Sequence, residues 1–210
     1  MRNRLLTCLV ALTAAFACRL GAFSLEENII LDNQGGCKVA LVMQVPEKYQ
    51  GLYKAVLKAV SPEGSGGLMD EGAVRKYFAA FPEFTVEGYH VFRRRDNLMV
   101  QLMLSAKDAR EAFATGALGY MVLGPSMDVI GDTELFIVLP RPERPPPEAM
   151  RRKANELAKA LGGLEFVVRL TTPTEMLETT GRRSDYNRCA WRISFEELLD
   201  NTYKDIKARW

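Results

Sequence analysis

Histidine, the side chain most often recruited for acid–base catalysis near neutral pH, occurs only once in the 210 residues, as His90. It lies in Gly88-Tyr89-His90-Val91-Phe92, a stretch typical of a β-strand, and no nucleophile motif accompanies it. The chain contains no G-x-S-x-G, no H-E-x-x-H and no S-x-x-K motif. We therefore expect no catalytic residues and a protein that is not an enzyme.

Cysteine is also scarce, with four residues, Cys8, Cys18, Cys37 and Cys189. No C-x-x-C and no cysteine–histidine spacing of the zinc-site type occurs, so we expect no metal ligands and no cofactor-binding residues. Cys37 and Cys189 lie near opposite ends of the mature chain. In an oxidising compartment they would form one disulfide if their Cα atoms lie within about 7 Å, or stay separate as buried thiols, and the sequence leaves both open.

An excess of one charge is missing as well. The chain has 28 basic and 26 acidic residues, and the two numbers become equal without Arg2 and Arg4 at the N-terminus. Nucleic-acid-binding proteins need clustered basic residues to neutralise phosphates, so we expect no DNA or RNA partner. Short basic runs at 93–95, 151–153 and 182–183 are interpreted as solvated surface charge.

Long hydrophobic runs are absent too, because no stretch reaches the roughly 20 residues that span a bilayer. The longest apolar run, from Leu5 to Ala17, is shorter and follows two arginines, which is the pattern of a secretory signal peptide. We predict a signal peptide over residues 1–22, cut after Ala17 or Ala22. A single domain over 23–210, with no transmembrane helix, would follow.

The position of the cut decides whether the protein is anchored. Cys18, directly after Ala17, is the candidate lipidation site, although Ala15 and Phe16 match the lipoprotein signal poorly. A cut after Ala22 would remove Cys18 and leave the chain unanchored. We expect an exported protein of the periplasm or cell envelope, secreted or lipid-anchored.

Several short segments with apolar and β-branched residues are joined by turn residues, which is typical of β-hairpins. One predicted hairpin joins 28–31 to 37–45 through Asn33-Gln34-Gly35-Gly36, and a second joins 84–95 to 98–105 through Asp96-Asn97. Further strands are predicted at 120–123, 134–139, 164–171, 174–178 and 187–194, with turn-rich stretches at 124–132 and 181–185.

Helices are predicted where apolar residues recur at helical spacing, at 49–60, 70–81 with Asp70 as cap, 107–114 started by Ser105, 145–161 and 195–210. The C-terminal helix 195–210 starts at the capping box Ser194-Phe195-Glu196-Glu197. Its apolar stripe, from Phe195 to Trp210, is predicted to cover the domain's own sheet. Hairpins with inserted helices predict the α+β class, an antiparallel or mixed sheet with helices packed on one side.

Some of these segments follow a familiar order: the turn 31–36, then Pro82-Glu83-Phe84-Thr85-Val86 after a helix, then the central hairpin, and finally Val167-Val168-Arg169-Leu170 with Trp191-Arg192-Ile193-Ser194-Phe195. This order resembles the LppM-like domain of exported bacterial lipoproteins and its spirochaetal relatives. The resemblance implies an α+β domain at the cell envelope, with lipid or glycolipid binding proposed for some members. It assigns no ligand residues.

Two hypotheses of different classes follow. The first is a non-enzymatic exported cell-envelope protein that binds a lipid or glycolipid between the sheet and the helices covering it. The alternative is a scaffold or assembly module that docks onto another envelope protein through an exposed apolar patch. The C-terminal stripe helps to separate them, because a buried stripe serves internal packing and an exposed stripe serves docking or membrane contact.

Overall fold

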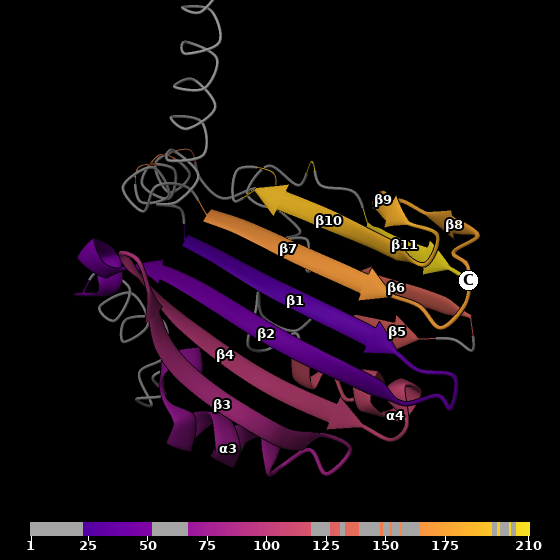
Figure 1. Ribbon diagram of the computed structural model, residues 1–210, viewed down its shortest axis with the longest axis horizontal. Helices are drawn as coiled ribbons and strands as arrows, with labels where there is room; N and C mark the ends of the chain where they lie inside the picture. The colour runs from indigo at the N-terminus through magenta and orange to yellow at the C-terminus, as the bar shows by residue number, and fades with distance from the viewer. Residues whose placement is uncertain are drawn as a thin grey trace, which may run out of the picture.

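The computed structural model describes residues 23–51, 67–118, 127–130, 133–138, 164–194 and 205–210, together with five single residues between 148 and 202. Its strands form two sheets (Figure 1). The seven-stranded sheet has the order β3 (Thr85–Arg94), β4 (Asn97–Ala106), β2 (Cys37–Pro46), β1 (Phe23–Leu31), β7 (Leu164–Thr171), β10 (Arg188–Ser194) and β9 (Arg182–Asp185). The four-stranded sheet has the order β5 (Met127–Ile130), β6 (Glu134–Val138), β11 (Ile206–Arg209) and β8 (Glu178–Thr179).

Both predicted hairpins are confirmed. β1 and β2 pair antiparallel, with Leu31 opposite Cys37 across the glycine-rich turn. β3 and β4 also pair antiparallel, with Arg94 opposite Asn97. Arg95, in the turn between them, has a φ of 55°, a left-handed conformation that tight turns require.

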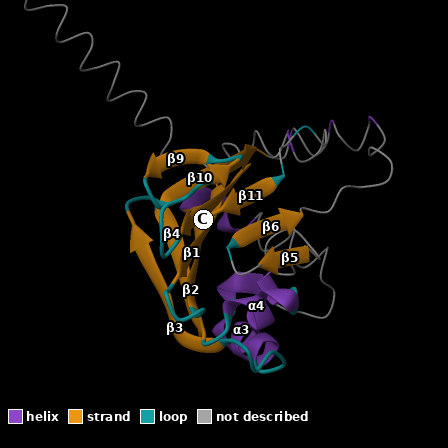
Figure 2. Ribbon diagram, turned by 90° about the vertical axis from the view of Figure 1, so that its right-hand side faces the viewer, coloured by secondary structure: helices purple, strands orange, loops and turns teal. Residues whose placement is uncertain are grey.

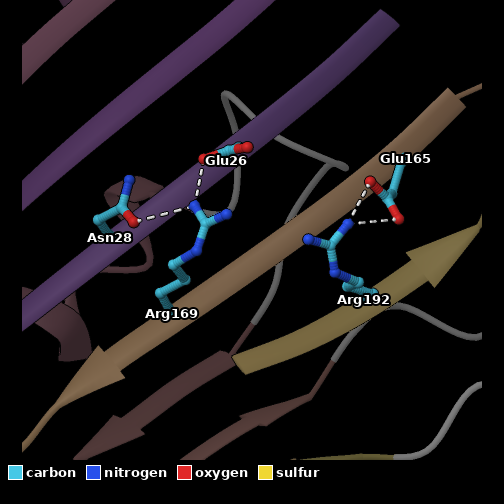
Figure 3. Close-up of polar contacts among 5 residues, drawn as sticks. All are labelled: Glu26, Asn28, Glu165, Arg169 and Arg192. Atoms are coloured by element: carbon cyan, nitrogen blue, oxygen red, sulfur yellow. Dashed lines mark hydrogen bonds and ion pairs between the residues drawn. The ribbon is translucent and has the colours of Figure 1, made fainter. Parts of the chain in front are cut away.

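The N-terminal and C-terminal parts of the chain meet in the middle of the larger sheet. β1 and β7 pair in parallel from Phe23 opposite Leu164 to Ile30 opposite Thr171, so the sheet is mixed. On the polar face of these strands, Arg169 forms an ion pair with Glu26 and also donates to Asn28 Oδ1 at 3.3 Å (Figure 3). A second ion pair joins the neighbouring strands, because Arg192 contacts Glu165 at 2.9 Å.

The other face of the seven-stranded sheet carries the core. Alternate residues of the central strands, among them Ile29, Leu41, Leu102 and Val168, are buried there, as expected for a sheet covered on one side. Figure 2 shows α3 (Glu71–Phe78), α4 (Ala109–Ala114), β5 and β6 on one side of this sheet. Strands dominate and the sheet is mixed, which agrees loosely with the α+β class. The packing of helices on one side of the sheet stays a prediction, and strands β5 and β6 lie on that side as well.

The two described α-helices begin at aspartate caps. Asp70 accepts from the backbone N–H of Ala73 at 3.1 Å, which confirms the predicted cap of α3. For α4 the prediction was wrong: Asp108, and not Ser105, accepts from the backbone N–H of Glu111 at 3.0 Å. Ser105 still belongs to β4, where its hydroxyl contacts Glu87.

The predicted C-terminal helix over 195–210 is wrong in its last part. Residues 206–209 form strand β11, which pairs with β6 and β8, and only Glu197 is described as helical in the preceding stretch. The turn-rich stretches also needed correction. Asp128 lies in β5, and 182–185 form β9 at the edge of the larger sheet. The strand predicted at 174–178 is reduced to Glu178–Thr179.

Of the two alternatives left open for Cys37 and Cys189, the structure shows separate buried thiols and no disulfide. Cys37 lies in β2 and Cys189 in β10. The strands β1 and β7 lie between β2 and β10, so three strand spacings of about 4.8 Å put the two cysteines at least roughly 14 Å apart. A disulfide needs Cα atoms within about 7 Å.

Several predictions lie wholly or mainly outside the described residues. They are the signal peptide 1–22 with its cut sites, the lipidation site Cys18, the helix 49–60, the strand 120–123 and the helix 145–161, of which only Glu148, Arg152 and Glu156 are described, as helical. Within the described residues, no helix has the length and apolar character needed to cross a membrane.

Candidate functional site

A groove of about 450 Å³ lies where the ends of the two sheets meet. Its walls come from five segments that are far apart in the sequence: the β1–β2 turn, the start of α4, the residue before β6, the segment after β7 and the residue after β11. Its polar and aromatic lining residues are Asp32, Asn33, Asp108, Arg110, Thr174 and Trp210. We call this site the junction groove.

The β1–β2 turn is a fixed wall of the junction groove. Asp32 Oδ1 accepts from the backbone N–H groups of Gln34 and Gly36, each at 2.8 Å, so the aspartate side chain organises its own turn. Gly35 has a φ of 85°, and a Cβ atom on Gly36 would lie 3.0 Å from the carbonyl oxygen of Ala106. The turn therefore needs glycine at both positions.

The start of α4 is tied to this turn. The backbone N–H of Ala109 donates to the carbonyl oxygen of Gly35 at 2.8 Å, and Asp108 caps the helix from the adjacent position. Burial raises the pKa of the Cys37 thiol to about 11, and the charges of Asp32 and Asp108 add to the rise. Both carboxylates thus lie near the same buried thiol.

The third wall belongs to the smaller sheet. The backbone N–H of Trp210 donates to the carbonyl oxygen of Thr133 at 2.9 Å, and the Trp210 side chain is buried at the groove. Below it, buried Thr172 donates through Oγ1 to the carbonyl oxygen of Thr174 at 2.8 Å. Asn187 Nδ2 donates to the carbonyl oxygen of Thr172 at 2.8 Å, so the segment after β7 is held from both sides.

A second groove, of about 460 Å³, lies over β6, β11 and β8. It is lined by Glu134 and Arg209, whereas their chain neighbours Thr133 and Trp210 line the junction groove. Arg209 is paired with Glu178 at 3.3 Å, and the Lys207 ammonium lies 4.6 Å from the centre of the Phe136 ring. Both cations of the second groove thus have a partner within it.

The junction groove combines hydrogen-bonding groups of both kinds with an aromatic ring. The Asp32 and Asp108 carboxylates accept hydrogen bonds, the Arg110 guanidinium donates them, and Asn33 and Thr174 can do both. Within the described residues, no group of three or more histidine, cysteine, aspartate or glutamate side chains is placed to hold a metal ion. The arrangement suits a polar, uncharged or zwitterionic ligand with several hydroxyl groups.

With this geometry in place, the chain can be compared with known proteins. A solved structure resembles it. The NMR structure of the folded domain of LppM from Mycobacterium tuberculosis matches with 10% sequence identity and a TM-score of 0.46, covering 90% of this chain and 91% of that one. No protein-family model matches the chain, and no curated protein matches it either. The relation to spirochaetal proteins stays a prediction.

The residues singled out from the sequence lie elsewhere. His90 is exposed on β3 and lies opposite Gln101 on β4. Gln101 is five residues from Ala106, at the end of β4 near the groove, so about 17 Å of strand separates His90 from the groove. Cys189 lies in β10, and of the two described cysteines Cys37 is the one that comes close to the groove. Sequence reasoning noticed the turn at 33–36 as a turn, but not the contributions of Asp108, Arg110, Thr174 and Trp210 to a site.

Proposed function

We propose that this chain is a non-enzymatic binding protein of the bacterial cell envelope that holds the polar headgroup of a lipid or glycolipid in the junction groove. The observation that carries the proposal is the groove itself. Carboxylates, a guanidinium, an amide and a hydroxyl from separate segments converge there beside an aromatic ring. Sites for small ligands commonly combine a few convergent polar groups with an apolar surface.

A sugar-bearing headgroup fits this set of groups. Its hydroxyls would donate to Asp32 and Asp108 and accept from Arg110, while the Trp210 ring would contact the apolar face of a sugar ring. The walls are held by backbone hydrogen bonds at the turn, at α4 and at Thr133, so little ordering would accompany binding. The export expected from the sequence would place the domain next to such lipids.

The proposed ligand position differs from the one predicted from the sequence. Between α3, α4 and the seven-stranded sheet, the described residues form a packed core in which Phe78 and Phe84 stack edge-on at 5.8 Å and Phe84 lies 6.5 Å from Phe113. An acyl chain would have to displace these rings. We therefore propose that the headgroup binds in the junction groove. The acyl chains would stay outside this core, in the membrane.

The alternative, a scaffold that docks through an apolar patch, loses its first candidate surface. Ile206, Ala208 and Trp210, the described apolar members of the C-terminal stripe, are buried. Ile206 and Ala208 serve internal packing, and Trp210 lies at the junction groove. In the rest of the stripe, from Phe195 to Tyr203, only the side chains of Glu197 and Thr202 are among those described. The absence of catalytic activity likewise stays a prediction.

The test is to purify the processed protein from its own envelope and identify co-purifying lipids by mass spectrometry. Binding is then measured with vesicles of phosphatidylcholine, with the same vesicles containing a glycosylated diacylglycerol, and with the free sugar headgroup. We expect binding to the glycolipid vesicles and weaker binding of the free sugar at the same site. Binding to none of the three would refute the proposed function.

A variant locates the site. Thr174→Arg inserts a long side chain into the junction groove without touching a described side-chain contact, because only the backbone oxygen of Thr174 accepts a hydrogen bond. It should weaken glycolipid binding about tenfold or more, since the groove is then filled. Ser184→Arg, on the exposed edge strand β9, is the matched control and should bind normally. Equal affinity of both variants would place the ligand elsewhere.

A further inference from the structure

The seven-stranded sheet ends in a long strand that pairs on only one side among the described strands. β3 has ten residues and pairs with β4 alone. Its other edge carries backbone N–H and C=O groups that could pair with another strand. Proteins usually protect such edges with prolines, lysines, bulges or covering segments. β3 has one bulge, at Glu87, and from Gly88 to Arg94 it contains neither proline nor lysine.

The end of β3 exposes apolar side chains on both of its faces. Val91 is 51% exposed and Phe92 is 43% exposed, and as neighbours they point to opposite faces of the sheet. Val100, the partner of Val91 on β4, is only 1% exposed. Val91 therefore lies at the uncovered margin of the sheet, beyond the core that buries Val100. A further strand beside β3 would cover Val91 and Phe92 together, which a ligand on one face would not do.

The charges along β3 identify the kind of strand that fits. Glu83 and Glu87 lie at its start and Arg93, Arg94 and Arg95 at its end, all of them exposed. A second β3 that runs antiparallel brings the acidic start of each strand to the arginine end of the other. A parallel copy would place arginine against arginine, which is unfavourable. The strand is therefore self-complementary in the antiparallel direction.

We propose that two copies of this chain associate through their β3 strands, antiparallel about a two-fold axis near His90, and so join their seven-stranded sheets into one. Such an interface is isologous, as two-fold interfaces are, and closes at two copies. It lies on the edge of the sheet opposite to β10 and β9. It is independent of the junction groove, so either proposal can fail without the other.

The first test is the mass of the processed protein in solution, measured by sedimentation over a range of concentrations. We expect a monomer–dimer equilibrium for the unmodified protein. Val91→Lys combined with Phe92→Lys should give a monomer, because it places charge on both faces of the pairing strand. Ile30→Lys, at a residue 50% exposed on β1 within the same sheet, is the control and should dimerise normally. Melting curves of all three chains check that they are folded.

A charge exchange tests the direction of pairing. The two-fold interface contains two contacts between the Arg94 end of one copy and the Glu87 end of the other. Arg94→Glu alone or Glu87→Arg alone puts like charges at both contacts, so each should weaken dimerisation about tenfold or more. Arg94 is chosen because Arg93 already forms an ion pair with Glu47 at 3.1 Å. An equimolar mixture of the two variants should form mixed dimers of nearly normal affinity. A monomeric unmodified protein, a dimer that survives the Val91 and Phe92 changes, or a mixture that does not associate would each overturn the proposal.

Discussion

Cys37 and Cys189 are buried thiols whose reactivity reports whether the core is closed to solvent. Burial raises the pKa of Cys37 and of Cys189 to about 11 each, so both thiols are protonated near neutral pH. Thiolates are the reactive form, and buried protonated cysteines are inert. We predict that a thiol reagent modifies neither cysteine in the folded processed protein and both after unfolding. A reducing agent should leave the melting temperature unchanged. A melting temperature lowered by the reducing agent would instead indicate that the two cysteines form a disulfide.

The same shifts give the stability a defined pH dependence. The folded-state pKa of about 11 lies above the ordinary cysteine value of 9.0, so the unfolded chain loses these protons first as the pH rises. The stabilisation is complete below about pH 9 and is lost between about pH 9 and 11. We predict that the free energy of unfolding falls over this range and that Cys37→Ala combined with Cys189→Ala flattens the decline. Denaturant titrations at several pH values measure it, and a slope that the double variant leaves unchanged would contradict the assignment.

Gly181 is a residue whose replacement should be costly. A Cβ atom there would lie 2.7 Å from Trp191 Cε2 and 3.0 Å from the carbonyl oxygen of Ala190. Trp191 cannot move freely, because its Nε1 donates to Thr180 Oγ1 at 2.9 Å. We predict that Gly181→Ala lowers the free energy of unfolding by about 1–3 kcal/mol in urea titrations. Gly51→Ala, at a position with no atom within 4 Å, is the control, and an equal loss there would argue against the close contact.

At the scale of elements, burial rather than charge should hold the parallel pair of β1 and β7. Leu170 is fully buried, whereas the side chains of Arg169 and Glu26 are 39% and 31% exposed. We predict that Leu170→Ala costs about 2–5 kcal/mol of unfolding free energy. Arg169→Met should cost about 1 kcal/mol or less, since solvent screens the ion pair. Denaturant unfolding of both variants measures the ratio, and a larger loss for Arg169→Met would reverse this ranking.

The sequence predicts some elements well because their signals are local. The turn residues 33–36 and Asp96 mark the two hairpins, although Asn97, predicted as a turn residue, already belongs to β4 and the turn is Arg95-Asp96. Asp70 marks the start of α3. β9 has no such signal, since Arg182-Arg183-Ser184-Asp185 are all exposed and the strand exists through its pairing with β10. β11 does have a local signal in the sequence, because apolar Ile206, Ala208 and Trp210 alternate with charged Lys207 and Arg209; the apolar residues are buried and the charged ones exposed. The capping box upstream favoured a helix, and pairing with β6 decided for a strand.

At the scale of the whole molecule, the arrangement depends on contacts that no local pattern contains. The parallel pairing of β1 with β7 joins residues more than a hundred positions apart, and it separates Cys37 from Cys189. The junction groove depends on the same long-range assembly, since its five segments range from Asp32 to Trp210. Its residues are individually ordinary turn, cap and surface residues. Only the closure of the smaller sheet against the end of the larger one brings them together.

The most direct test of the junction groove is a titration of the ¹⁵N-labelled processed protein with the headgroup sugar of the glycolipid that it binds, followed by amide and indole chemical shifts. We predict that the largest changes occur at 32–36, 108–110, Thr133, Thr174 and the Trp210 indole, with a single dissociation constant. Residues of the packed core, such as Phe78 and Phe113, should change little. Changes concentrated in that core, or on the polar face around Arg169, would contradict the account.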